Sequence, residues 1–127
     1  MSTSIFHDQA EFLVAGDVVG GSAAAESLAF SLVEEELNEF METDPFIPSY
    51  ESTYPSDSNA IKEALDVVYV LAQYLNVTVG ADKAKELWDA LHENNMSKCV
   101  EGKLVKSEQG KILKPEGYVS LDIEKLL

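Results

Sequence analysis

The segment from Ala60 to Leu75 is apolar around most of its circumference when it is wound as an α-helix. Such a helix needs neighbours on several sides, because apolar side chains left in water forfeit the free energy of burial. Residues 56–58, Ser-Asp-Ser, supply candidate N-caps. We therefore expect a central helix from about Asn59 to Asn76, which ends at a β-branched turn before Gly80.

Glycine and proline residues divide the rest of the chain into segments that are expected to form further helices. Helical periodicity bounded by glycine or proline predicts three more helices, at about Ser4 to Ala15, Ala24 to Thr43 and Ala81 to Lys98. A proline-rich loop separates the second helix from the third, with Pro45, Pro48 and Pro55. Near the C-terminus, a small hairpin is expected where two short segments flank Ser-Glu-Gln-Gly, Lys103 to Lys106 and Lys111 to Leu113.

The fold class that follows is an all-α helical bundle of about four to five helices, with a small C-terminal hairpin or extended tail. The length of 127 residues fits one domain covering the whole chain, residues 1–127. A central helix that is apolar nearly all round also predicts an oligomer, a homodimer or a homotetramer, because a chain this short has few helices with which to cover it.

Charge and cysteine content narrow the function classes. Twenty-three acidic residues against nine basic ones give a formal net charge of −14, which repels polymeric nucleic acid and an anionic membrane surface. Cys99 is the single cysteine, so an internal disulfide is impossible and a reducing, cytoplasmic location is expected. No apolar run approaches the roughly 20 residues needed to cross a bilayer. Bound divalent cations would still let an acidic chain hold a small phosphate compound.

Two acidic residues break the pattern of the second predicted helix. On a helical wheel Glu36 falls near the middle of the apolar arc, and Glu39 falls within the same arc, between Leu28 and Leu32. Glu35 lies at the border of the arc. An ionised carboxylate on a core face is costly unless it is paired or bound to metal. The alternative is that Glu34 to Glu36 form an ordinary solvated helix face.

The central helix repeats the same spacing. Glu63 and Asp66 form a second i,i+3 acidic pair within its apolar surroundings. Two such pairs on packed helices would present four carboxylates, the hard oxygen ligands that Mg²⁺ or Mn²⁺ requires. A di-iron bundle is less favoured, because it needs Glu-x-x-His on two helices and Asp89 to His92 is the one approximate match.

The fourth predicted helix carries polar residues where its apolar stripe should continue. Asn95 and Lys98 occupy these positions. A lysine there is suited to hold a phosphate oxygen, and an asparagine amide can donate a hydrogen bond to another. The alternative is a solvated, frayed helix end.

These residues, in this order, resemble a known family. Glu35-Glu36-x-x-Glu39 followed by Glu63-x-x-Asp66 resembles the E-E-x-x-E and E-x-x-D signature of all-α NTP pyrophosphohydrolases. That group includes MazG-like, phosphoribosyl-ATP pyrophosphohydrolase-like and dimeric dUTPase proteins. Residues 94–98, Asn-Asn-Met-Ser-Lys, and residues 113–118, Leu-Lys-Pro-Glu-Gly-Tyr, look like the C-terminal half of small MazG-like proteins, including those carried by phages. The resemblance extends from about Ser4 to Ile123.

The resemblance implies metal-dependent hydrolysis of a nucleoside or deoxynucleoside triphosphate to a monophosphate and pyrophosphate, between the α and β phosphates. It implies four ligands for Mg²⁺ or Mn²⁺, namely Glu36, Glu39, Glu63 and Asp66. It also implies that Glu35 activates or positions the attacking water. The substrate contacts that it suggests are Asn95, Lys98, Lys114, Tyr118 and Gln9.

Two alternatives to a general NTP pyrophosphohydrolase stay open. Within the same group, the chain could be a more restricted enzyme that acts on dUTP or on phosphoribosyl-ATP. From a different class, it could be a non-enzymatic acidic interaction protein that mimics the charge of a nucleic acid, which would require its acids to be spread over exposed surface.

Overall fold

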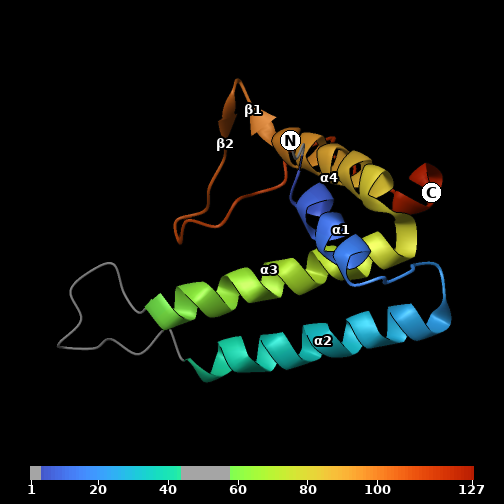
Figure 1. Cartoon of the computed structure of the whole chain (residues 1–127). Helices are drawn as coiled ribbons and strands as arrows, with labels where there is room; N and C mark the ends of the chain where they lie inside the picture. Colours follow the sequence, from blue (N-terminus) through green and yellow to red (C-terminus); the bar gives the residue numbers. More distant parts are fainter. Residues whose placement is uncertain (1–3, 44–57) are drawn as a thin grey trace. The chain divides into compact units, whose positions relative to one another are not determined.

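The computed structural model describes residues 4–43 and 58–127, and this part of the chain is mostly helical (Figure 1). It holds four α-helices, α1 Ile5–Ala15, α2 Ala23–Glu42, α3 Ser58–Val79 and α4 Ala81–Met96, and a 3₁₀ turn, η1 Ile123–Leu126. Its two short strands are β1 Cys99–Val100 and β2 Lys103–Leu104. The predicted helical class is confirmed. The predicted proline-rich loop and the N-cap candidates Ser56 and Asp57 lie outside the described residues.

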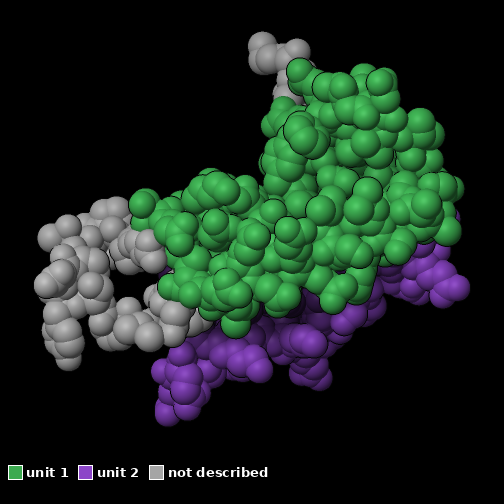
Figure 2. Space-filling model, turned by 60° about the horizontal axis from the view of Figure 1, so that its bottom comes forward, with its two compact units in different colours: residues 1–84 green, residues 85–127 purple. Residues whose placement is uncertain are grey.

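The chain forms two compact units, residues 1–84 and residues 85–127, which Figure 2 distinguishes by colour. The first contains α1, α2, α3 and the first turn of α4. The second contains the rest of α4, the two strands and the C-terminal segment. The single functional domain over residues 1–127 stays a prediction.

In the first unit, α3 packs against both α1 and α2, and α2 and α3 run side by side in opposite directions (Figure 1). Serine caps start the two outer helices: the Ser4 hydroxyl accepts from the His7 amide, and the Ser22 hydroxyl accepts from the Ala25 amide. Two small apolar clusters hold the helices together. One is Phe6, Ala72 and Ala84, and the other is Leu13, Ala29 and Val77.

The turn between α1 and α2 is fixed to α3 at Gly20 and Gly21. A Cβ atom at Gly20 would lie 3.0 Å from the Cα and carbonyl oxygen of Val77, so only glycine fits this close approach without a backbone shift. The Gly21 amide donates a 2.8 Å hydrogen bond to the Val77 carbonyl. This contact holds the start of α2 against the last turns of α3.

The C-terminal end of α3 differs from the prediction. The β-branched residues 77–79 continue the helix instead of ending it near Asn76. Val77 is buried against Leu13 and Ala29, and this burial outweighs the small helix penalty of a β-branched side chain. The Thr78 hydroxyl donates to the carbonyls of Tyr74 and Leu75 within the same helix. The helix ends at Gly80, whose φ of +85° suits glycine.

In the second unit, the hairpin lies partly where the sequence predicts it. The Ser-Glu-Gln-Gly segment does reverse the chain, because Gly110 donates to the Ser107 carbonyl and Lys106 forms a bridge with Ile112. The two-stranded sheet, however, is built one turn earlier, where β1 and β2 pair in antiparallel register. A Glu-Gly turn at residues 101–102 joins them, and positive φ values at both positions give the twist that a tight hairpin needs.

No single helix within residues 4–43 and 58–127 combines the length and the apolar composition that crossing a membrane requires.

Candidate metal centre and phosphate-binding cluster

Three of the four predicted metal ligands converge in the first unit. Glu36 and Glu39 from α2 and Glu63 from α3 each offer a carboxylate oxygen, and these oxygens lie within 4.8 Å of one another. The i,i+3 spacing puts the first two on one face of α2, and the packing of α2 on α3 brings the third opposite them. We call Glu36, Glu39 and Glu63 the acidic cluster. The helical wheel predicted that these three acids and Asp66 would come together, and the structure groups the first three.

The acidic cluster is poorly satisfied by the protein itself. Glu36 Oε2 and Glu63 Oε2 are buried, and neither has a hydrogen-bond partner among the described residues. Burial raises the pKa of Glu36 above its ordinary value, and a hydrogen bond with Glu39 adds to this shift. The negative charges of Glu39, Asp66 and Glu63 raise it further. A proton held between neighbouring carboxyls is what such a site retains when no cation offsets the repulsion.

Asp66, the fourth predicted ligand, is paired with a lysine. Lys62, one turn earlier on α3, donates a hydrogen bond to Asp66 Oδ2, and its Nζ lies 4.0 Å from Glu63 Oε1. The hydrogen bond to Asp66 raises the pKa of Lys62 above its ordinary value, and the charges of Asp66 and Glu63 reinforce the shift. Asp66 therefore lies next to the acidic cluster and contributes to its electrostatics, but its carboxylate is shared with Lys62.

The donor set fits a hard divalent cation. Carboxylate oxygens are the protein ligands that Mg²⁺ and Mn²⁺ prefer, and the acidic cluster supplies three of them within a few ångströms. The two buried oxygens that lack a partner are the atoms for which a cation would compensate the cost of burial. The residues present are thus suited to hold Mg²⁺ or Mn²⁺.

Two other predicted site residues of the first unit lie in contrasting places. Glu35 is exposed on α2, next in sequence to Glu36. Gln9 is fully buried: its amide nitrogen donates to Gln73 Oε1 at 3.3 Å, and its amide oxygen accepts from Asn76 Nδ2 at 2.8 Å. In the first unit, then, Gln9 links α1 to α3, whereas Glu35 is exposed to solvent.

The remaining predicted residues gather in the second unit. Lys98 Nζ lies 5.5 Å from the centre of the Tyr118 ring, and Lys114 Nζ lies 5.9 Å from it, so two cations share one aromatic side chain. Lys98 Nζ also donates to Asn95 Oδ1 at 3.4 Å. We call Asn95, Lys98, Lys114 and Tyr118 the basic cluster. In a chain with only nine basic residues, this concentration of positive charge is suited to a phosphate group.

Asn94 positions the basic cluster and was missed by the sequence analysis as a site residue. Its side-chain oxygen accepts from the Tyr118 hydroxyl at 2.7 Å, and its side-chain nitrogen donates to the Val119 carbonyl at 2.8 Å. These two bonds tie the segment around Tyr118 to α4. Asn94 belongs to the Asn-Asn-Met-Ser-Lys motif, but the sequence does not reveal which of its two asparagines turns towards the tyrosine.

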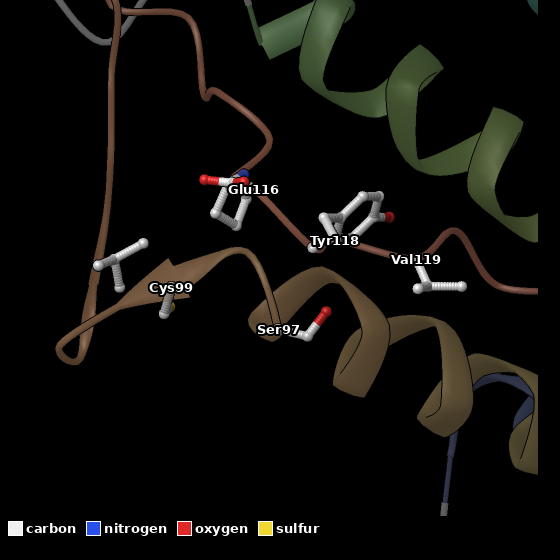
Figure 3. Close-up of a pocket in the computed structure, with 8 residues that line it drawn as sticks. Ser97, Cys99, Glu116, Tyr118 and Val119 are labelled. Carbon is white, nitrogen blue, oxygen red and sulfur yellow. The ribbon is translucent and has the colours of Figure 1, made fainter.

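An open cavity of about 440 Å³ adjoins Tyr118 in the second unit (Figure 3). Tyr118 and Val119 border it on one side and Ser97 and Cys99 on the other, and Glu116 contributes a carboxylate. Its size is that of a small-molecule site. The cavity thus shares Tyr118 with the basic cluster and is large enough for a small molecule.

Comparisons of the chain with protein-family models, with curated proteins and with solved structures find no match. The MazG-like assignment therefore stays a prediction that rests on the residues described above.

Proposed function

We propose that this chain is a metal-dependent nucleoside triphosphate pyrophosphohydrolase. The observation that carries the proposal is the acidic cluster, in which carboxylates from two helices share one small volume and two buried oxygens have no hydrogen-bond partner within residues 4–43 and 58–127. An acidic interaction protein would instead need its carboxylates spread over exposed surface. The convergence of Glu36, Glu39 and Glu63 favours ligation of a cation, on which the proposed hydrolysis depends.

In the proposed reaction, water attacks a phosphorus atom of the α–β anhydride, a new P–O bond forms, and the bridging P–O bond breaks to give a monophosphate and pyrophosphate. Glu36, Glu39 and Glu63 would hold a Mg²⁺ or Mn²⁺ ion, which would supply charge neutralisation for the triphosphate and would lower the pKa of water. Glu35, exposed beside the acidic cluster, accepts the proton that the attacking water loses. No side chain needs to form a covalent bond to the substrate.

Substrate binding is assigned to the basic cluster. Lys98 and Lys114 neutralise phosphate oxygens, and Asn95 donates a hydrogen bond to one of them. Tyr118 contributes its ring and borders the cavity that receives the base or sugar. Gln9, whose side chain is hydrogen-bonded to Gln73 and Asn76, is assigned to holding α1 against α3 and not to a contact with the substrate.

We also propose that the protein works as a homodimer or a homotetramer. Several apolar side chains on α3 are exposed in the single chain, and they include Ile61, Leu65 and Val68. Spacings of three and four residues put these side chains on one face of the helix. A second copy would cover that face, and light scattering at micromolar concentration should give a mass of at least two chains. A monodisperse monomer would contradict this proposal.

The direct test of the activity is to incubate the purified protein with each common NTP and dNTP, and with phosphoribosyl-ATP, in the presence of Mg²⁺ or Mn²⁺. Pyrophosphate and orthophosphate are then measured separately. We expect pyrophosphate with metal and none after chelation, and the best substrate will distinguish a general enzyme from a dUTPase or a phosphoribosyl-ATP pyrophosphohydrolase. Release of orthophosphate alone, or no turnover of any of these compounds, would contradict the proposed function.

A further inference from the structure

Lys62 is the cation beside the acidic cluster in the first unit. Its ammonium group pairs with Asp66, and it lies 4.0 Å from Glu63 Oε1, so it touches both acids of the i,i+3 pair on α3. Its charge also acts on Glu36, which contributes to the interaction from the neighbouring helix. A single lysine is therefore coupled to acids on both helices of the predicted metal centre.

An ordinary helical ion pair provides a comparison. Lys85 and Asp89 on α4 have the same i,i+4 spacing, with Nζ and Oδ2 2.7 Å apart. Such exposed pairs contribute little to stability, because both ends are solvated and screened. At Lys62 the acidic neighbours are less exposed: the side chain of Asp66 is 33% exposed and that of Glu63 is 16% exposed, whereas that of Lys62 is 67% exposed. Its charge thus acts on carboxylates that water solvates poorly.

We propose that Lys62 is a resident counter-cation, which neutralises the acidic cluster and Asp66 when no divalent ion is bound and releases Asp66 when one binds. This inference rests on the proposed metal centre. A positive charge this close both occupies a prospective ligand and repels an incoming cation. Lys62 thereby weakens metal binding and sets the concentration of divalent cation at which Asp66 becomes available as the fourth carboxylate.

The chemistry of lysine suits this role. Its ammonium is a compact charge on a flexible stem, and it can move away from Asp66 without disturbing the helix, because most of the side chain is already in solvent. Its neighbour Glu63 belongs to the acidic cluster, so departure of the exposed lysine changes the charge at the site while α2 stays packed on α3.

The test compares Mn²⁺ affinity, measured by electron paramagnetic resonance of the free ion, for the wild type, Lys62→Met and Lys62→Arg. The measurement is made at pH 8, so that competition from protons is small. Lys85→Met is the matched control, because it removes the same charge from an i,i+4 pair on α4. Circular dichroism checks that each variant is folded, and Lys62→Gln replaces Lys62→Met if that variant does not fold.

We expect Lys62→Met to bind Mn²⁺ roughly five- to tenfold more tightly than the wild type. Lys62→Arg and Lys85→Met should stay within about twofold of the wild type. Unchanged or weaker binding by Lys62→Met, with the wild type binding normally, would overturn the role of Lys62 while leaving the metal centre intact. If neither the wild type nor Lys62→Met binds Mn²⁺, the proposed metal centre fails and the role of Lys62 fails with it.

A second measurement uses the unmodified protein. Lysine acetylation by an amine-reactive ester is followed by mass spectrometry with and without Mg²⁺. Release from Asp66 should raise the labelling rate of Lys62 by roughly two- to fivefold, while Lys85 should be unaffected. A labelling rate of Lys62 that stays level or falls when Mg²⁺ binds would contradict the displacement.

Discussion

The acidic and basic clusters differ in how far the protein satisfies its own polar groups. In the acidic cluster, like charges lie close together and Glu36 Oε2 and Glu63 Oε2 are buried without a hydrogen-bond partner among the described residues. In the basic cluster, the Tyr118 hydroxyl is bonded to Asn94, and its ring contacts two ammonium groups. The acidic cluster therefore contains buried oxygens that its protein neighbours do not hydrogen-bond, whereas the side chains of the basic cluster already contact one another.

This difference assigns different roles to the two clusters. Buried polar groups without partners are costly, so their presence points to a ligand that compensates them. A network that is already bonded holds its charges in place before any ligand arrives, which lowers the cost of ordering side chains on binding. The acidic cluster should therefore respond strongly to metal, and the basic cluster should change little when a substrate binds.

The largest effect is expected from Glu36→Gln, which removes the carboxylate that interacts with Glu39, Glu63 and Asp66. Pyrophosphate release should fall by about 100-fold or more, because a neutral amide is a poor ligand for Mg²⁺. Glu34→Gln is the matched control, since Glu34 is exposed on the same helix. Equal activity of Glu36→Gln and Glu34→Gln would remove the distinction between the acidic cluster and the rest of α2.

Lys98→Ala should have the next largest effect. Loss of a charged contact to a phosphate should lower kcat/KM by about 10- to 100-fold and leave the helical circular-dichroism spectrum largely intact. Lys103→Ala, in β2, is the control for the loss of one positive charge. If Lys98→Ala and Lys103→Ala have the same kcat/KM in steady-state kinetics, Lys98 does not contact the substrate, and the alternative of a solvated helix end holds.

A smaller effect concerns pH and metal together. Because the pKa of Glu36 is raised in the folded state, its contribution to stability is fully present below the unfolded pKa and is lost as pH rises through the folded value. Without metal, the wild type should therefore lose about 2–5 °C of melting temperature, relative to Glu36→Gln, between pH 5 and pH 8. The gain from Mg²⁺ should be larger at pH 8, where fewer protons compete.

Thermal melts of both proteins at the two pH values, with and without Mg²⁺, measure this linkage. Glu36→Gln provides the control for titration of all the other acids in this strongly acidic chain. If the melting temperatures of the wild type and of Glu36→Gln change in parallel between pH 5 and pH 8, Glu36 does not have a raised pKa in the folded state.

The smallest effect is expected from Asn94→Ala, which removes two hydrogen bonds from the pre-organised cluster. Each bond contributes about 1 kcal/mol, so the segment around Tyr118 should open locally more often. Hydrogen exchange of the Tyr118 amide, which donates to the Pro115 carbonyl, reports that opening. Ser107→Ala also removes a side-chain hydrogen bond in the second unit and should leave Tyr118 unaffected; equal exchange in both variants would argue against pre-organisation by Asn94.

The sequence predicted the acidic cluster well because the relevant spacing lies within helices. Once α2 and α3 are helical, i,i+3 spacing puts Glu36 and Glu39 on one face, and the surrounding apolar residues turn that face towards α3. The i,i+4 spacing of Lys62 and Asp66 also favours their ion pair, but the helical-wheel analysis considered only the acidic residues on the apolar face.

Features that depend on contacts between distant segments were not predictable in this way. The continuation of α3 through Val77 depends on burial against α1 and α2, which a local rule about β-branched residues ignores. The burial of Gln9 depends on Gln73 and Asn76, more than sixty residues away. The two-stranded sheet is a different case, because it is local. It forms around the Glu-Gly turn at residues 101–102, whereas the prediction put the hairpin at the longer Ser-Glu-Gln-Gly segment.

The most direct test of the shared metal centre is a thermal melt of the wild type and of Glu63→Gln, each with and without Mg²⁺. Glu63→Gln removes one charge at nearly constant shape, so its melting temperature without metal should stay level or rise as repulsion within the acidic cluster falls. The increase caused by Mg²⁺ should be clearly smaller than in the wild type, because one of the converging oxygens is lost. A Glu63→Gln protein with the full metal-induced increase would show that Glu36, Glu39 and Glu63 do not form one site.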